Sequence, residues 1–345
     1  MEIVQQADYR VFNLEIPLTD QQTPIEKCGP NLIAPTSVIH GYKAIGVDFL
    51  TLANNHILDQ GEQGLWSTTE QLNRAGIAYA GVGHTPDEAA APHIIELGQK
   101  KASIYCCAEH EFSIITEHTA GANPFDPLES LDHVAELKKQ CDYVIVLYHG
   151  GKEHYRYPSP NLQKTCRKLV EKGANLVICQ HTHCIGCEEK YQGGTIIYGQ
   201  GNFLFDDSNS EYWQTSLLIQ INDDFTVSYI PLIKRNETVR LATAEQAREI
   251  MDGFHSRSEE IQIPGKIEEK YGAFSKQMLD SYLMRISSTG KSFIFKAVNK
   301  LTGHRFASWY LHRRYKKQDL LAIANCLDCE AHRELFLKGL GEPRQ

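Results

Sequence analysis

Five short apolar runs, each ending in polar residues that suit a metal ion or a phosphate, constrain the fold of this chain more than any other feature. The polar ends are Asn13-Leu14-Glu15, Asn54-Asn55-His56, His149-Gly150-Gly151, Gln180-His181-Thr182-His183 and Gly199-Gln200-Gly201-Asn202. Helical patterns separate the runs, in 63–75, 130–140 and 162–172. This alternation indicates a largely parallel sheet covered by helices, and such sheets carry their chemistry beyond the carboxyl ends of the strands. We therefore expect the five polar segments to meet at one sheet edge.

The apolar runs predict strands that cover 9–14, 49–53, 78–81, 102–107, 143–148, 176–179 and 195–198. Residues 213–222 and 225–234 predict an antiparallel hairpin, because Asp223-Asp224 separates them. Gly76 and Gly173 follow basic last turns and predict left-handed helix ends. Later the pattern is helical, in 244–260, 267–286 and 318–338. We expect an α/β domain over 1–240 and a helical C-terminal extension over 241–345.

Composition excludes several classes of protein. The net charge of −8 argues against a surface built for nucleic acid. Because no apolar run reaches 18 residues and the N-terminus lacks a basic region with an apolar core, we expect neither a membrane span nor a signal peptide, and a cytoplasmic location. The ten cysteines are too sparse for a disulfide scaffold in 345 residues, so we expect mostly buried free thiols.

The strand-end residues combine imidazole, carboxylate and amide groups, which together suit Mn, Zn, Fe or Mg. A lone histidine at a strand end is more often a capping or surface group, so the prediction depends on the whole set. We expect an extended His-x-His segment to direct His181 and His183 to the same side, where they can serve adjacent ions. The glycines after His149 and around Gln200 are expected to let the backbone approach a ligand closely. Two ions about 3.5–4 Å apart can clamp the attacking and leaving oxygens of a phosphoryl transfer.

Several segments in order, from about residue 5 to 235, resemble the CapA family of capsule and poly-γ-glutamate biosynthesis proteins. The most specific are Asn54-Asn55-His56-x-x-Asp59 and Gly201-Asn202-Phe203-x-Phe205-Asp206. The resemblance implies a calcineurin-like metallophosphatase fold, a sandwich of mixed sheets flanked by helices. Family members open with a strand that ends in Gly-Asp, usually behind a membrane anchor or export signal. This chain starts after that point, so the resemblance implies an N-terminally truncated domain without that strand.

The resemblance also implies roles and a function. Glu15 would bridge two divalent metal ions, Asn55, His149 and His181 would bind the second ion, and His183 the first. His56 would protonate the leaving oxygen. Supporting or substrate-facing roles fall to Asn13, Asn54, Asp59, Glu153 and Asn202. The implied function is a metal-dependent hydrolase or transferase that acts on phosphoester or related bonds in cell-envelope polymer synthesis. The alternative is a non-catalytic accessory subunit that binds an anionic polymer or a capsule synthesis protein.

Two further features leave alternatives open. Cys184-x-x-Cys187, together with Cys179, His181 and His183, offers the spacing of a structural zinc site, although no second cysteine pair lies nearby. Segment 288–318 holds eight Lys or Arg and six aromatic residues but no Asp or Glu. It is either a solvated basic face with core aromatics or a surface for an anionic partner, such as a membrane or an acidic polymer.

Overall fold

Two β-sheets carry the polar segments, and the chain that forms them belongs to the first of two compact units, 1–268 and 269–345. The computed structural model describes residues 2–205, 210–287, 292–303 and 305–341. Asp206 of the Gly-Asn-Phe motif and residues 288–291 and 304 of the basic segment lie outside these ranges.

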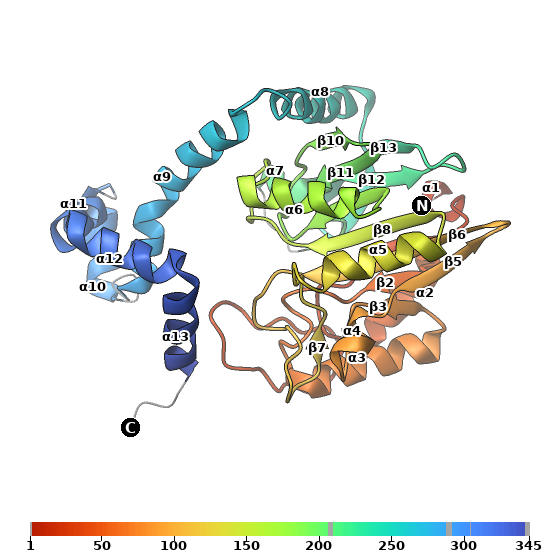
Figure 1. Ribbon diagram of the computed structural model, residues 1–345, viewed down its shortest axis with the longest axis horizontal. Helices are drawn as coiled ribbons and strands as arrows, with labels where there is room; N and C mark the ends of the chain where they lie inside the picture. Colours follow the sequence, from red (N-terminus) through yellow and green to blue (C-terminus); the bar gives the residue numbers. More distant parts are fainter. Residues whose placement is uncertain (1, 206–209, 288–291, 304, 342–345) are drawn as a thin grey trace. The chain divides into compact units, whose positions relative to one another are not determined.

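The strands of the first unit form two main sheets (Figure 1). The smaller sheet is parallel and consists of β1 (Val11–Asn13), β2 (Phe49–Thr51) and β3 (Ala78–Ala80). The larger sheet has the order β10-β11-β9-β8-β6-β5. Its four central strands are parallel: β11 (Gly194–Tyr198), β9 (Leu176–Gln180), β8 (Tyr143–His149) and β6 (Lys100–Ala108). Antiparallel strands border it, β10 (Glu188–Tyr191) and β5 (His93–Leu97).

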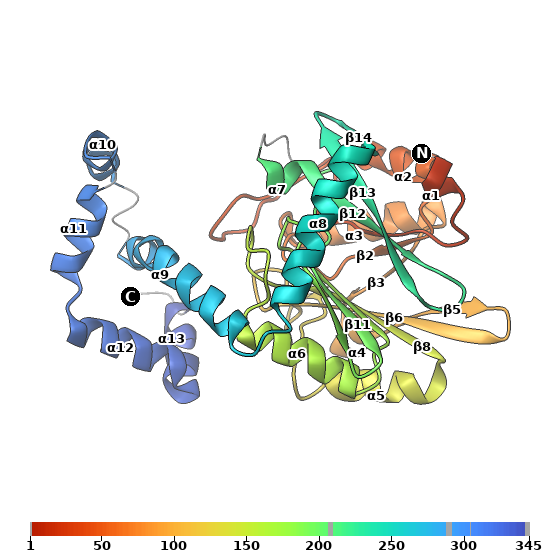
Figure 2. The same ribbon diagram turned by 90° about the horizontal axis from the view of Figure 1, so that it is seen from above.

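Alternating side chains of the larger sheet fill two different cores, as the period of a strand requires. In β8, Val144, Val146 and Tyr148 join the core that contains the buried residues of α5 (Ser130–Gln140) and α6 (Pro160–Glu171). Ile145 and Leu147 join the core shared with Phe49 of the smaller sheet. The opposite face of the smaller sheet packs against α2 (Ile39–Ile45) and α3 (Gly61–Ala75). The result is a helix–sheet–sheet–helix sandwich (Figures 1 and 2), which confirms the predicted α/β class of mixed sheets flanked by helices.

The remaining elements of the first unit close the edges of the sandwich. They are α1 (Glu2–Gln5), the 3-10 helix Thr36–Val38, β4 (Val82–Gly83), α4 (Pro86–Ala90), β7 (Gly121–Ala122), α7 (Glu211–Gln214) and α8 (Ala244–Glu260). The closing sheet consists of β12 (Thr215–Ile221), β13 (Val227–Arg235) and β14 (Thr238–Leu241). The predicted hairpin is present as β12–β13, but its predicted start at Trp213 is wrong, because Trp213 lies in α7.

The second unit is helical. It contains most of α9 (Lys266–Ile286), then α10 (Phe293–Leu301), α11 (Arg305–Arg314), α12 (Lys317–Asp328) and α13 (Glu330–Gly341). The predicted single helix over 318–338 is wrong. At Cys329 the backbone becomes extended, with ψ of 120°. This extended residue ends α12 and separates it from α13. Among the described residues, none of the helices combines the length and apolar character needed to cross a bilayer.

Candidate metal centre

The polar segments meet where the two sheets face each other. Glu15 lies two residues beyond β1 and Asn55 four beyond β2, both from the smaller sheet. His149 is the last residue of β8, and His181 directly follows β9, in the larger sheet. Since parallel strands end on the same side, packing the two sheets face to face brings four strand ends together. The site therefore lies at the edges of two sheets, whereas we expected all of its residues at the edge of a single sheet.

The Nε2 atom of His149 is the centre of this arrangement. It lies 2.9 Å from Asn55 Oδ1, 3.1 Å from His181 Nδ1 and 3.4 Å from Glu15 Oε1. All of these atoms can donate a lone pair. Atoms that share one ion at about 2.0–2.2 Å lie about 3–3.5 Å from each other, so the observed separations match those of metal ligands.

An unpartnered carboxylate oxygen supports the same conclusion. Glu15 Oε1 is buried and accepts no hydrogen bond from the described residues, whereas Oε2 accepts one from Asn13 Nδ2 at 3.1 Å. Burying a charged oxygen without a hydrogen bond is costly, and a bound cation would remove that cost. The donor set and this orphan oxygen therefore fit a divalent ion.

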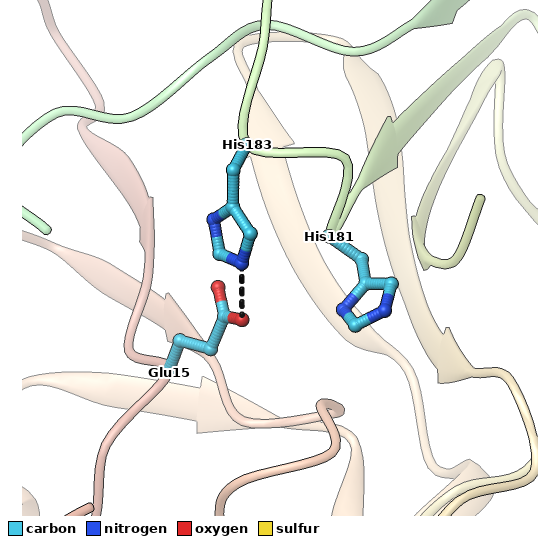
Figure 3. A group of neighbouring side chains, drawn as sticks. All are labelled: Glu15, His181 and His183. Atoms are coloured by element: carbon cyan, nitrogen blue, oxygen red, sulfur yellow. Dashed lines mark ion pairs between the residues drawn. The ribbon is translucent and has the colours of Figure 1, made fainter. Parts of the chain in front are cut away.

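His183 also approaches the carboxylate of Glu15. Its Nε2 lies 3.7 Å from Glu15 Oε1, the contact drawn in Figure 3. Within the described ranges, donor atoms of Glu15, His181 and His183 all lie within 4.8 Å of one another, which makes them a candidate metal-binding group. Glu15 Oε1 is thus close to donor atoms of both His149 and His183, as a bridging ligand would be.

The backbone of the His-Thr-His segment differs from the expected extended one. His181 has φ of 76° and His183 has φ of 53°, so both residues adopt the left-handed conformation. Residues other than glycine rarely adopt this conformation, because it strains their backbone. Such strain concentrates at functional sites. The expectation that strand alternation aligns the two rings is therefore wrong. Two left-handed residues bring the ring centroids to 6.0 Å instead.

Neighbouring groups orient the His183 ring. Its Nδ1 lies 2.9 Å from Asn202 Oδ1, which leaves Nε2 to face Glu15. The rings of Phe205 and Trp213 stack on His183 with centroid distances of 4.8 and 4.7 Å. Hydrogen bonding of the second ring nitrogen is how proteins commonly fix a metal-binding histidine.

The electrostatics of the cluster favour the protonation states that bind metal. Burial alone would raise the pKa of the Glu15 carboxyl, but electrostatic interactions with His149, His183 and His181 lower it to about 2. Burial, together with the neighbouring His149, holds the pKa of His181 well below its usual value. An ionised Glu15 beside a neutral His181 is ready to bind a cation without losing a proton.

His56 belongs to a second, adjoining network. Its Nδ1 lies 2.6 Å from Asp59 Oδ2, and the same oxygen accepts the Leu32 N–H at 2.6 Å. Lys27 Nζ donates to Asp59 Oδ1 and lies 3.3 Å from His56 Nδ1. The side chains of Lys27 and Asp59 expose only 1% and 0% of their surface. His56 is thereby held through Nδ1, one residue away from Asn55.

The other expected supporting residues differ in their placement. Asn54 Nδ2 donates to the Leu14 carbonyl at 2.8 Å, and Asn54 Oδ1 accepts the His56 N–H at 3.0 Å, so Asn54 ties the ends of β1 and β2 together. Glu153 is exposed, and its carboxylate lies 3.5 Å from Lys152. No described hydrogen bond or ion pair joins Glu153 to the cluster.

Sequence reasoning missed three charged residues of this region. Lys27 lies in a loop without periodicity. Glu111 accepts a hydrogen bond from Asn55 Nδ2 at 2.8 Å, and Glu109 accepts the Gly151 N–H at 3.0 Å. Burial raises the pKa of the Glu109 carboxyl. The position of Glu109 and Glu111 just beyond β6 is the signal that could have identified them, since the other site residues also follow strands.

Two expectations about neighbouring residues change. A Cβ on Gly199 would lie 2.5 Å from Thr182 Oγ1. The absence of a side chain at Gly199 therefore makes room for Thr182, whereas we expected it to make room for a ligand.

The zinc alternative is not favoured. Cys179 Sγ points into the core, 3.5 Å from Cys166 Sγ, and burial raises the pKa of the Cys184 thiol to about 11. Among the described residues, the candidate metal-binding group that includes His181 and His183 contains Glu15 and no cysteine.

Comparison with known proteins assigns the chain to a family. The model of the family described as bacterial capsule synthesis protein PGA_cap matches residues 1–207. The PGA biosynthesis protein CapA of Bacillus subtilis is 26% identical over 213 residues, covering 59% of this chain and 55% of that protein. The capsule biosynthesis protein CapA of Bacillus anthracis is 28% identical over 212 residues, covering 59% and 52%. The chain thus spans about half the length of these curated relatives.

Solved structures align with lower similarity. A 5'-nucleotidase precursor from Thermus thermophilus aligns with 15% identity and a TM-score of 0.35, covering 70% of this chain and 45% of that one. Because the family model covers well over half of the residues, the family follows from the sequence match. The chain belongs to the PGA_cap family of bacterial capsule synthesis proteins.

Proposed function

We propose that this protein is a divalent-metal-dependent hydrolase of phosphoester or related bonds that acts in the synthesis of a cell-envelope polymer. The observation that carries the proposal is the convergence of donor atoms from Glu15, Asn55 and His181 around His149 Nε2. We place the activity in the α/β domain, residues 1–240. The names of the relatives, PGA and capsule biosynthesis proteins, support the link to polymer synthesis.

The donor atoms form two unequal sets. Asn55, His149 and His181 with Glu15 would hold one ion, and His183 with Glu15 would hold another. We propose Mn, Zn, Fe or Mg, because imidazole, carboxylate and amide oxygen together suit these ions. Bound there, the ions would supply Lewis-acid stabilisation of phosphoryl oxygens and a water nucleophile at neutral pH.

His56 is the proposed general acid. With Nδ1–H donated to Asp59, a doubly protonated His56 can transfer its Nε2 proton to the leaving oxygen and keep its orientation. Lys27 and the Leu32 N–H hold the Asp59 carboxylate in place during this transfer. Asn54 positions the same loop through the His56 backbone N–H.

Single-turnover hydrolysis of a generic phosphodiester, with Mn or Zn added to metal-free protein, tests the proposal. We expect metal-dependent turnover that His56→Ala lowers about 10²–10⁴-fold, the usual contribution of a general acid. Metal binding should persist in this variant, because His56 is not among the proposed ligands. His118→Ala is the matched control, since its side chain is exposed and lies in a surface loop.

The outcomes separate the hydrolase from the accessory subunit. Metal-dependent turnover that His56→Ala abolishes and His118→Ala preserves supports the hydrolase. Stoichiometric metal binding without turnover of any phosphodiester would instead support a non-catalytic subunit that binds an anionic polymer or a capsule synthesis protein through this site. A folded protein that binds no divalent ion would refute both roles of the cluster.

A further inference from the structure

The outer face of α10 exposes large apolar side chains in the second unit. Phe293, Ile294 and Leu301 have 84%, 75% and 86% of their surface exposed. Ile294 and Leu301 are seven positions apart and lie on one line of the helix, and Phe293 flanks that line at about 80–100° around the axis, so these three form one apolar stripe. Scattered single apolar residues are common on protein surfaces, whereas a continuous stripe marks an interaction site.

Packing within the helix pair α10–α11 does not account for this stripe. The inward face of α10 contributes Phe295, which is buried and contacts Phe306 and Tyr310 at centroid distances of 5.3 and 5.4 Å. Ala307 and Leu311 of α11 are also buried. The pair therefore has its own core on one side, and the stripe is a second apolar face on the other.

The charges of the segment that forms α10 and α11 have one sign. Residues 292–317 contain seven Lys or Arg and no Asp or Glu. Lys296 and Lys300 are exposed on α10 itself, and Lys300 follows Phe293 by seven positions, which places it beside the stripe. On α11, Trp309 is 57% exposed and the Arg313 guanidinium lies 5.8 Å from its ring centroid. Exposed apolar groups, an exposed aromatic residue and several cations on the same pair of helices are typical of a surface that lies in a membrane interface.

We propose that α10 and α11 dock on an anionic phospholipid surface, with the stripe inserted among the acyl chains and the basic residues against the headgroups. A soluble polyanion would use the cations but leave Phe293 and Leu301 exposed to water. A second copy of this chain would bring seven cations against seven, which disfavours self-association. Both helices lie beyond residue 207, outside the region that the family model matches. The docking surface is independent of the metal centre and of its proposed activity.

Co-sedimentation of the full chain with vesicles tests this surface. We expect binding to phosphatidylcholine vesicles that contain phosphatidylglycerol, weakening with salt, and little binding to phosphatidylcholine alone. The triple variant Phe293→Ser, Ile294→Ser and Leu301→Ser should lower the affinity about tenfold or more. Its side chains have little contact with the rest of the unit, so the fold should persist, which circular dichroism will check.

Charge reversal tests whether vesicle binding depends on the basic residues of α11 or only on the net charge of the chain. Arg313→Glu with Arg314→Glu should also lower vesicle affinity about tenfold or more. Arg74→Glu with Lys139→Glu changes the net charge equally but lies in the first unit, on exposed side chains of α3 and α5, and should leave binding near wild type. Leu335→Ser with Leu337→Ser in α13 is the matched control for exposed apolar residues.

Three results would overturn the proposal. The first is no binding to the anionic vesicles, or binding that the stripe variant and the Arg313/Arg314 variant leave unchanged. The second is retention on soluble poly-glutamate that matches vesicle binding and is insensitive to the stripe variant, which would assign the surface to a polyanion. The third is a dimer by light scattering that the stripe variant dissociates, without vesicle binding, which would assign the stripe to a second copy.

Discussion

Replacing Lys27 by methionine is expected to destabilise the first unit by about 3 kcal/mol. The Lys27–Asp59 pair is almost fully buried, with 1% and 0% of the side chains exposed. Removing one partner of such a pair usually costs about 3–5 kcal/mol, because the other charge stays buried and uncompensated. Asp59 Oδ2 keeps two partners, His56 Nδ1 and the Leu32 N–H, each at 2.6 Å. These contacts keep part of the carboxylate satisfied, and we therefore expect the lower end of that range.

A second variant tests whether the unpaired buried charge of Asp59 causes this loss of stability. Lys27→Met combined with Asp59→Asn removes the orphan charge and keeps an oxygen that can accept the Leu32 N–H. We expect the double variant to be more stable than Lys27→Met alone, by about 1–2 kcal/mol. Lys139→Met removes an exposed ion pair with Glu136 and should stay near wild type.

Urea unfolding followed by tryptophan fluorescence measures these differences. The chain has three tryptophans, Trp66, Trp213 and Trp309. Trp309→Phe as background leaves only the two tryptophans of the first unit, so the signal reports on that unit. A loss below about 1 kcal/mol for Lys27→Met, or a double variant less stable than the single one, would refute the reasoning about the buried charge.

Three further predictions concern the site and its supports. Asn202→Ala frees Nδ1 of His183 and should weaken divalent-metal affinity about 10–100-fold in a competition titration, with the fold intact by circular dichroism. In metal-free protein, burial holds the pKa of His181 below 6.5, so below that pH the unfolded state binds more protons than the folded state. Stability should be fully present above pH 6.5 and fall as the pH decreases, and urea midpoints that stay constant would contradict this. Gly76→Ala, at φ of 70° with nothing within 4 Å, should cost about 1–2 kcal/mol. Gly81→Ala, at φ of 91° with a neighbouring Cβ at 2.6 Å, should cost more, and equal urea midpoints would contradict the steric argument.

The parts of the fold that followed from sequence are those with strong local patterns. Fully buried strands such as β8 and β9 have nearly continuous apolar runs, and each was predicted within about two residues of its observed ends. The edge strands β5, β10 and β14 were missed. Their side chains are half-exposed and mixed in polarity, so no local pattern predicts these strands. They form because they pair with a neighbouring strand.

The candidate site shows the same division. Glu15, Asn55, His149, His181 and His183 stood out because each follows an apolar run, and the structure brings all five together. Lys27 did not stand out, since a lysine in an irregular loop is ordinarily solvated. Its burial against Asp59 follows only from the folding of the 19–35 loop over α3, where Thr23 and Leu32 bond to Gln60.

Sequence alone determined the order of the buried central strands and of the helices between them, and the chemical types of the candidate ligands, because strand period, helix caps and donor chemistry are properties of neighbouring residues. Only the tertiary structure decided that two sheets pack face to face and set Glu15 and Asn55 opposite His149 and His181. It also decided that His181 and His183 adopt left-handed backbone conformations. Such features depend on contacts between residues far apart in the sequence, such as Asn55 and His149, which are 94 positions apart, and packing of the whole domain stabilises them against their local cost.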